Sequence, residues 1–253
     1  PSTRSRGVGF IGGESNLSVV TSMTAVSGAA FIVLALLRVW LTMRGRRVVR
    51  MGTLADGTEV LVRRNGAVRE LVLAHGRDEL VQSRSDGGGY VREFHRAMRT
   101  HPRPRRVLFL GGGACVAPMQ FERRYADAFI DVVEKEPLVA EAARSHFDFG
   151  ESERLKLHVA DARDFLAVAS PYDLVIVDLY DAHGIPPELA TTDFFGSIRK
   201  ILRPGGTLVA NLIRPPDAGV LAALGAAFPG RALDVQEVTD ENALVFVVTE
   251  SGS

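Results

Sequence analysis

The stretch Val107–Pro118, VLFLGGGACVAP, decides the fold. A short apolar run meets three consecutive glycines, Gly111–Gly113, and a helical pattern follows. Apolar runs without polar alternation are typical of parallel strands covered on both faces, and glycines allow a tight turn and a close approach to a ligand. The stretch therefore predicts a strand, a ligand-binding loop and a helix. Because the loop continues as Ala114, Cys115 and Val116, the sequence leaves open whether it still holds a cofactor.

Strands and helices alternate from Arg106 onward, which predicts an α/β fold with a doubly wound, mostly parallel sheet of seven strands. No helix separates the last two strands, so they should form an antiparallel hairpin. Seven strands that end in such a hairpin resemble the class I S-adenosylmethionine-dependent transferases, a Rossmann-like fold. The strands are expected at 107–110, 128–133, 155–159, 174–178, 207–212, 232–238 and 243–248, and the helices at 116–124, 137–147, 162–169, 193–202 and 217–228.

A small β-subdomain should precede this sheet. Two β-rich runs flank Asn65-Gly66, a strong hairpin signal, and a third short strand is expected at Glu79–Ser83. Tyr90–Arg99 has the pattern of a helix that links the subdomain to the sheet. We therefore predict three parts: a tail with a hydrophobic helix at 1–45, the small β-subdomain with its linker helix at 46–100, and the transferase domain at 101–253.

The hydrophobic helix has two interpretations. Ser15–Leu37 contains no charged residue, and a cluster of arginines follows it. The length suits a membrane span, and the arginines would place the rest of the chain in the cytoplasm. Residues 15–43 would then anchor a cytoplasmic catalytic domain. Several serines and threonines weaken this interpretation, and the alternative is a helix that is buried or that joins copies of the chain in a homo-oligomer.

The composition is that of a globular protein without an overall charge. Lys and Arg total 30, as do Asp and Glu, so no net field draws nucleic acid to the chain and no nucleic-acid partner is expected. Cys115 is the single cysteine, which excludes an intrachain disulfide framework and a cysteine-rich zinc site. No metal site is predicted.

Acidic residues follow the second and third strands of the predicted sheet, where a doubly wound fold binds its ligand. Glu134 stands about 20 residues after the glycines, the spacing of an acid that accepts hydrogen bonds from ribose. Asp161 could accept a hydrogen bond from an adenine amino group, with the Ala162 amide facing the ring. Asp161 is also a favoured residue for capping the next helix, and both roles can hold together.

Two further carboxylates, Asp178 and Asp181, follow the fourth strand in YDLVIVDLYDAHG. Both can face the pocket, with Tyr180 between them as a candidate substrate contact. Together they could bind a cationic amine and take a proton from it, which is the work of a general base. The alternative is that Asp178 only ends the strand and that Asp181 lies in a solvated turn. Tyr90, His95 and His183 are further candidates, but no spacing singles them out.

These segments resemble the spermidine synthases and related polyamine aminopropyltransferases. The resemblance covers about residues 48–213 and rests on RRVLFLGGG, VVEKEP, VADARDFL, YDLVIVDLYDAHGIP and ILRPGGTLVANL. It implies that decarboxylated S-adenosylmethionine is held by Gly111–Gly113 and the strand-end acids, including Asp178. It further implies that Asp181 deprotonates the attacking amine. Tyr90 matches a tyrosine on the substrate side after a shift of one residue.

The sequence also departs from that family. The family's loop places an aspartate after the third glycine, where it meets the amine of the donor, and this chain has Ala114. Residues 114–116 are expected to add bulk near the donor's methionine-derived tail. Leu179 and Tyr180 replace two small hydroxyl residues. Residues 214–253 are too few to supply the family's second substrate wall with its aromatic residues.

Three functions follow from this sequence. The first is a spermidine synthase-like transferase that moves an aminopropyl group from decarboxylated S-adenosylmethionine to a small-molecule amine. The second is a methyltransferase that uses intact S-adenosylmethionine on another acceptor, since methyl transfer depends mainly on placement of the two reactants. The third is a membrane-tethered binding or scaffold protein on a degenerate transferase fold, because fold alone does not fix function.

Overall fold

The computed structural model describes residues 32–33, 47–88, 91–92, 95, 98, 103–180 and 185–250. The chain divides into two units, residues 1–46 and 47–253, and only Ile32 and Val33 of the first unit are described. Apart from these two residues, the predicted hydrophobic helix at 15–43 lies outside the described residues, and so does its membrane interpretation. Within the described part, no helix combines the length and apolarity needed to cross a membrane. The domain boundaries at 45 and 100 stay predictions.

A four-stranded antiparallel sheet begins the second unit, with its strands in sequence order. The predicted hairpin joins its second and third strands: Asn65 pairs with Val68, and Gly66 takes the positive φ of +63° that the turn requires. The first strand was not predicted, because it lies in the arginine cluster assigned to the flank of the hydrophobic helix. The strands are β1 (Arg47–Thr53), β2 (Glu59–Asn65), β3 (Val68–His75) and β4 (Asp78–Arg84).

The larger sheet has seven strands in the order β10-β11-β9-β8-β5-β6-β7. Neighbouring strands from β9 to β7 are parallel, and β11 is antiparallel to both β9 and β10. The predicted fold class and the terminal hairpin are therefore confirmed. The strands are β5 (Arg106–Leu110), β6 (Phe129–Glu134), β7 (Leu155–Val159), β8 (Tyr172–Val177), β9 (Leu202–Ile213), β10 (Asp234–Glu237) and β11 (Asn242–Val248).

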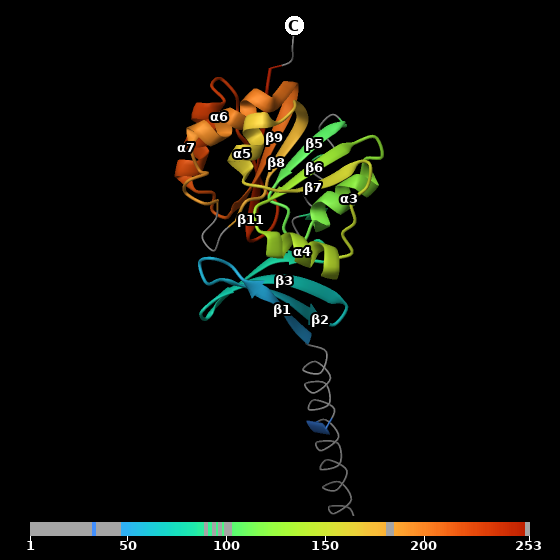
Figure 1. Ribbon diagram of the computed structural model, residues 1–253. Coiled ribbons are helices and arrows are strands. Elements are labelled where there is room, and N and C mark those ends of the chain that lie inside the picture. Colours follow the sequence, from blue (N-terminus) through green and yellow to red (C-terminus); the bar gives the residue numbers. More distant parts are fainter. Residues whose placement is uncertain are drawn as a thin grey trace, which may run out of the picture. The chain divides into compact units, whose positions relative to one another are not determined.

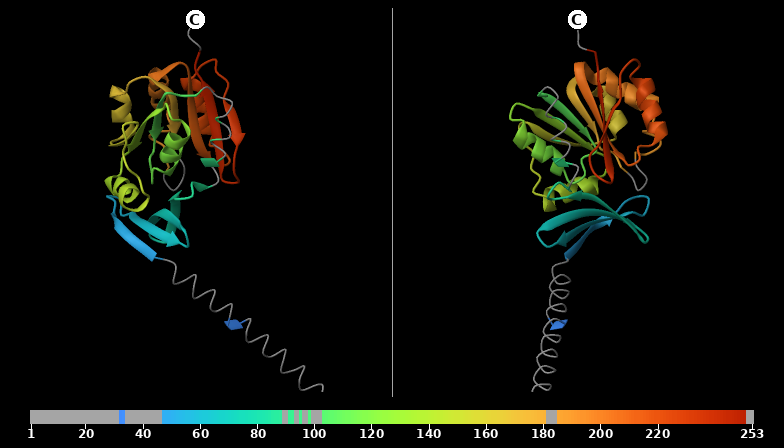
Figure 2. Two further views of the ribbon diagram at one scale, coloured as in Figure 1. Left: turned by 90° about the vertical axis from the view of Figure 1, so that its right-hand side faces the viewer. Right: turned by 180° about the vertical axis from the view of Figure 1, so that it is seen from behind.

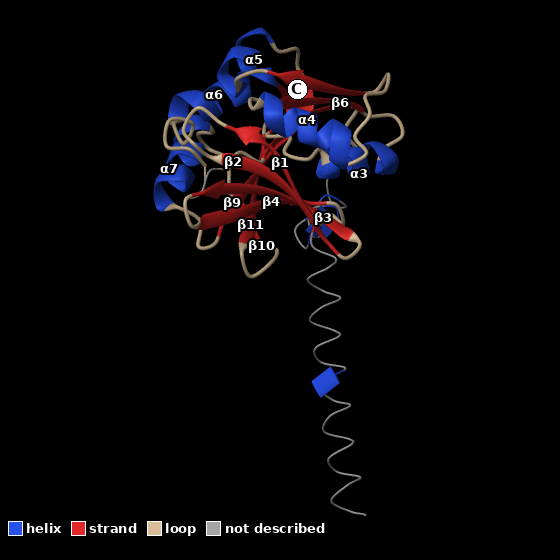
Figure 3. Cartoon of the chain, turned by 60° about the horizontal axis from the view of Figure 1, so that its bottom comes forward, coloured by secondary structure: helices blue, strands red, loops and turns tan. Residues whose placement is uncertain are grey.

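Helices cover both faces of this sheet (Figure 1). In Figure 3 the α3 and α4 helices lie together on one side, and α5, α6 and α7 lie together on the other. Three helix starts are fixed by side-chain caps, in which Asp161, Thr191 and Asp217 each accept a hydrogen bond from a backbone N–H of the first turn. The helices are α3 (Val116–Arg124), α4 (Pro137–His146), α5 (Ala162–Val168), α6 (Thr192–Ile201) and α7 (Ala218–Ala227).

Successive strand residues feed two separate cores, one on each face of the sheet. On β5, for example, Leu108 and Leu110 belong to the core beneath α5, α6 and α7, whereas Val107 and Phe109 belong to the core beneath α3 and α4. All four side chains are at most 2% exposed. A strand buried on both faces must be apolar at every position, which is why the apolar runs predict these strands well.

The small sheet packs against the larger domain through α4 (Figure 2). Val60 and Leu71 of the small sheet are fully buried in one cluster with Val139 and Ala142 of α4. Gly52 has no side chain where a Cβ would lie 2.8 Å from a methyl carbon of Leu138. A sheet of this size has too little hydrophobic core to be stable alone, so its packing against α4 supplies the rest of that core.

We expect His95 to make stability fall with acidification. Its ring lies near Phe121 and Tyr125, at centroid distances of 5.8 and 6.5 Å. Burial, aided by Arg124, lowers the pKa of His95 from 6.5 to about 4. Between these values the unfolded chain binds the proton and the folded chain does not, so its contribution is lost as pH falls from 6.5 toward 4.

The expected loss attributable to His95 is about 1–2 kcal/mol, allowing for partial solvent screening. Urea unfolding at several pH values would measure it, with His95→Phe as the comparison, because other groups also titrate in this range. The free energies of unfolding of the two proteins should differ in their pH dependence only below pH 6.5. Parallel pH dependences would contradict the assignment.

Candidate active site

The glycine loop lies at the switch point of the larger sheet, where the chain leaves β5 between β6 and β8. Gly111 has a φ of +94°, and a Cβ on this residue would lie 2.1 Å from the backbone oxygen of Asp178. The Asp178 N–H in turn donates to the Leu110 carbonyl at 2.8 Å. The glycine thus allows the loops after β5 and β8 to touch, and this edge of the sheet is where doubly wound folds bind ligands.

The small sheet contributes directly to this loop. The Ser83 hydroxyl of β4 accepts a hydrogen bond from the Ala114 N–H at 3.1 Å. Gly113 has a φ of +48°, and a Cβ there would lie 2.6 Å from the Ser83 Oγ. The absence of a side chain at Gly113 therefore lets β4 reach the loop. No sequence pattern indicates this role of Ser83, since its partner lies 31 positions away along the chain.

The residues that replace the end of the family's loop mostly point away from the pocket. Ala114 and Cys115 are completely buried, and burial raises the pKa of the Cys115 thiol well above its usual value. Cys115 adopts a left-handed conformation with a φ of 56° at the residue that directly precedes α3. Among these three residues only Val116 lines the pocket. The expected added bulk is therefore confined to Val116, and the prediction was wrong for Ala114 and Cys115.

Glu134 ends β6 as predicted, and its carboxylate holds the glycine loop. One oxygen accepts hydrogen bonds from the N–H groups of Gly112 and Gly113, at 3.2 and 2.9 Å, and the other accepts from Glu136 at 3.0 Å. The residue is 7% exposed. Burial raises the pKa of Glu134, while the three amide donors act in the opposite direction. Contact with ribose stays a prediction for this residue.

Asp161 follows β7 and caps α5. Its carboxylate accepts a hydrogen bond from the Arg163 N–H at 2.8 Å. Its side chain is 41% exposed, so one capping contact leaves much of the carboxylate accessible. Ala162 begins the helix beside it and is buried. The capping role is thus present, and the predicted contacts with adenine stay predictions.

Asp178 sits at the end of a short chain of amides. Asn211 on β9 donates to Asp178 Oδ1 at 2.9 Å, and Asn242 on β11 donates to Asn211 Oδ1 at 3.2 Å. Asn211 is 3% exposed, and buried polar groups of this kind need such partners. Together the two asparagines hold the carboxylate at the glycine loop. Asn211 was missed from the sequence, although it lies in the segment ILRPGGTLVANL.

A pocket of about 650 Å³ opens beside the glycine loop and Asp178. Tyr180 lines it, with a buried hydroxyl whose pKa is raised by burial and by the Asp178 charge, although nearby Asn242 lowers it. Asp181, Tyr90 and His183 lie outside the described residues. Further lining comes from β4, the turn at 87–88, and the turn between β10 and β11 with the first residue of β11, that is, residues 80–84, 87–88 and 239–242.

Two parts of this lining were not predicted. The Gln82 side chain has a buried oxygen without a hydrogen-bond partner in the described structure, and such an oxygen suits a ligand that donates. The terminal hairpin supplies a wall through Thr239–Asn242. Residues 214–253 therefore do form one side of the pocket, although these four residues include no aromatic. Among the described residues, no group of His, Cys, Asp and Glu could hold a metal ion.

The matched family model is the spermine/spermidine synthase domain, which covers residues 94–212. A polyamine aminopropyltransferase from Vibrio vulnificus is 31% identical over 126 residues, which are 48% of this chain and 42% of that protein. The chain therefore aligns with less than half the length of this curated relative.

Two solved structures extend the comparison. A spermidine synthase in complex with the transition state analogue AdoDATO has a TM-score of 0.66 at 20% identity and covers 81% of this chain and 75% of its own. The human methyltransferase-like protein 13 in complex with SAH has a TM-score of 0.55 at 28% identity, covering 62% of this chain and 82% of its own. At 20% identity, the likeness to the spermidine synthase structure shows a shared fold. The resemblance to the spermidine synthases that the sequence predicts is thus confirmed, and it centres on the domain that carries this pocket.

Proposed function

We propose that the chain is a transferase that moves an aminopropyl group from decarboxylated S-adenosylmethionine to an amine. One observation carries the proposal: the glycine loop contacts the Asp178 loop at the switch point, and both line one pocket. The match to the spermine/spermidine synthase domain supports the reaction type. Because Gly111 and Gly113 carry no side chains, the loop packs closely against Asp178 and Ser83, and its backbone lines the pocket.

In this proposal the residues around the loop hold the donor. Gly111–Gly113 approach it with backbone atoms, Glu134 accepts hydrogen bonds from ribose, and Asp161 with the Ala162 amide binds adenine. Asp178 lies where the transferred group would be. The Glu134 oxygen that accepts from the Glu136 N–H makes only that one amide contact, so it keeps a lone pair that can accept from a ribose hydroxyl. The donor, when bound, supplies a carbon activated by a sulfonium.

The acceptor is an ammonium ion without a free electron pair on nitrogen, so it must lose a proton before it attacks. A new N–C bond forms while the C–S bond breaks, and the sulfur keeps that electron pair. The ammonium proton has to move to a base, and the carboxylate of Asp181 is the proposed base. Asp178 anchors the amine, and Tyr90 and Tyr180 contact the acceptor. The buried Tyr180 hydroxyl can hydrogen-bond an amine without being ionised, since its pKa is raised.

Methyl transfer from intact S-adenosylmethionine is the second candidate, and one observation favours it. Ala114 stands where the spermidine synthase pattern has an acid, and it is buried away from the pocket. The loop therefore offers no carboxylate to the amine of a decarboxylated donor. The likeness to methyltransferase-like protein 13 is consistent with this alternative.

A donor comparison tests the two candidates. The purified chain is titrated calorimetrically with intact and with decarboxylated S-adenosylmethionine, and each donor is then incubated with putrescine. We expect tighter binding of the decarboxylated donor and formation of spermidine. Tighter binding of the intact donor, with a methylated product, would select the second candidate. Binding of neither donor would contradict both candidates and leave the degenerate scaffold.

A further inference from the structure

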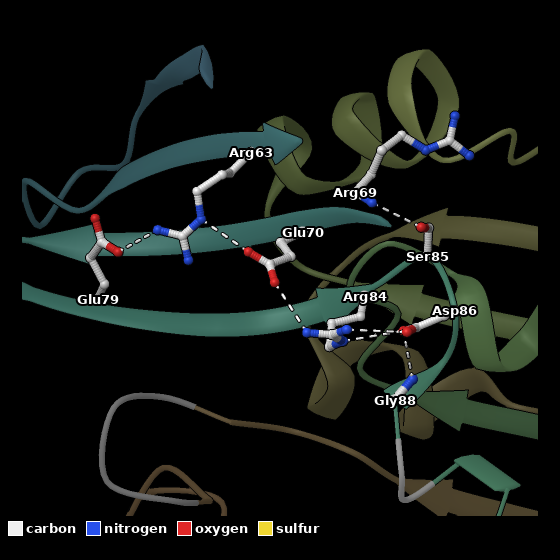
Figure 4. A network of polar contacts seen from close by, with 8 residues as sticks. All are labelled: Arg63, Arg69, Glu70, Glu79, Arg84, Ser85, Asp86 and Gly88. Atoms are coloured by element: carbon white, nitrogen blue, oxygen red, sulfur yellow. Dashed lines mark hydrogen bonds and ion pairs between the residues drawn. The ribbon is translucent and has the colours of Figure 1, made fainter. Parts of the chain in front are cut away.

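A chain of alternating charges crosses the small sheet (Figure 4), and one of its members, Arg84, lines the pocket. Arg63 donates to Glu79 at 2.7 Å and to Glu70 at 2.9 Å. The other oxygen of Glu70 accepts from Arg84 at 3.1 Å. Arg84 then donates two hydrogen bonds to Asp86, at 3.1 and 3.2 Å. Five side chains from β2, β3, β4 and the following turn are thus joined in one network.

Glu70 is the buried member of this network. Its side chain is 6% exposed, whereas that of Glu79 is 51% exposed and that of Asp86 is 47% exposed. A buried carboxylate is costly unless it is paired and hydrogen-bonded, and here two guanidinium groups satisfy it. Glu70 therefore helps to position both arginines, Arg63 together with Glu79 and Arg84 together with Asp86.

Arg84 is the only basic side chain among the described residues that line the pocket. All three of its guanidinium nitrogens donate to carboxylates, one to Glu70 and two to Asp86. These carboxylates raise the pKa of Arg84, and its positive charge is balanced before any ligand binds. Without Glu70, Asp86 would be the one carboxylate left in this network to balance the positive charge of Arg84 beside the pocket.

The rest of the pocket carries negative charge. Asp178 lies at the glycine loop, and Asp240 and Glu241 lie at the exposed turn between β10 and β11. No ion pair joins the side chains of Asp240 and Glu241 to another described residue. Since Arg84 is neutralised, the lining as a whole favours a cation, and a cationic acceptor is what the proposed reaction requires.

We propose that Glu70 is a positioning residue that neutralises Arg84 and thereby keeps the pocket selective for a cationic acceptor. This inference rests on the proposed function for the identity of that acceptor. Asp86 assists, because its Oδ1 also accepts from the Gly88 N–H at 3.1 Å and so fixes the turn that lines the pocket. Glu70 itself does not line the pocket, so it acts through Arg84.

This inference predicts that substitutions at Glu70 and at Arg84 change the affinity for putrescine in opposite directions. The dissociation constant of putrescine is measured calorimetrically on the full chain at low salt. Glu70→Gln should raise it about three- to tenfold, the range expected for one uncompensated charge beside a solvated pocket. Arg84→Gln should lower it by a similar factor. The double variant should return close to the wild-type value, and high salt should shrink all these differences.

Two matched variants separate charge from structure. Glu79→Gln removes the outer partner of Arg63 in the same network and should leave putrescine binding unchanged. Glu70→Asp keeps the charge and should stay within about twofold of the wild type, a small change beside the full Coulomb term. A merely structural role would weaken binding in every variant, and no such role makes Arg84→Gln bind more tightly.

The outcomes distinguish this inference from the proposed function. Weaker binding in both Glu70→Gln and Arg84→Gln, equal effects of Glu70→Gln and Glu79→Gln, or no putrescine binding by the wild type would each overturn it. If Glu70→Gln does not fold, the sign of the Arg84→Gln effect decides. A wild type that binds putrescine with these variant effects but transfers no group would support the inference and contradict the proposed transfer reaction.

Discussion

Replacing Gly111 with alanine is expected to abolish donor binding and group transfer. A Cβ at this position would lie 2.1 Å from the Asp178 backbone oxygen and 2.7 Å from its carbonyl carbon. Because these atoms are backbone, no side-chain rotation relieves the overlap, and the φ of +94° adds strain for any residue but glycine. The two loops must separate, at a cost of about 3–5 kcal/mol or more.

Gly225→Ala is the matched control for this substitution. Gly225 lies in α7 and has no positive φ, and a Cβ there would meet no atom within 4 Å apart from its chain neighbours and the backbone of its own helix. The control should therefore unfold at the same temperature as the wild type or slightly above it, since alanine is the better helix former. Donor affinity by calorimetry and thermal unfolding would be measured for both. A Gly111→Ala variant that binds the donor normally would show that the two loops need not touch.

The second large effect is expected for Asp181. If this residue is the base, Asp181→Asn should lower kcat about 10²- to 10⁴-fold, the usual contribution of a general base, with a smaller change in KM. Raising the pH toward the ordinary pKa of an alkyl amine, about 10, supplies more deprotonated acceptor and should recover part of the lost rate. This recovery distinguishes a missing base from a distorted site.

Asp127→Asn provides the comparison for Asp181. Asp127 is exposed and precedes β6, so it lies at the opposite, amino-terminal edge of the parallel strands. Its amide variant should retain wild-type kcat at every pH. If Asp181→Asn keeps its rate at neutral pH, another group takes the proton, and Asp178 is then the next residue to test.

The strands of the larger sheet could be predicted because each is buried on both faces. A run such as Leu174–Val177 has no polar interruption, and its signal is local. The first strand of the small sheet lacks this signal: Val48 and Val49 are adjacent and both exposed, at 56% and 43%. Neither alternation nor a continuous apolar run marks such a strand. Pairing with β2 defines it, and that pairing is not visible in the strand's own residues.

The same distinction separates the predicted and missed site residues. Gly111–Gly113, Glu134 and Asp178 follow strands of a regular fold, so their place at one edge follows from topology. Ser83 and Gln82 reach the loop from another sheet, and no spacing of residues along the chain predicts that contact. The burial of Ala114 likewise depends on packing between segments far apart in the sequence, which no local pattern shows. Its expected position beside the donor was wrong for this reason.

The hydrogen bond between Ser83 and Ala114 has a thermodynamic consequence. This bond joins the small sheet to the loop that would hold the donor. The free energy of docking the small sheet and the free energy of donor binding are therefore linked. By reciprocity, a donor that stabilises the docked sheet must bind more tightly to the docked form by the same factor. Affinity for a nucleoside is then partly decided by β4, a strand that contacts the loop from outside the nucleotide-binding fold.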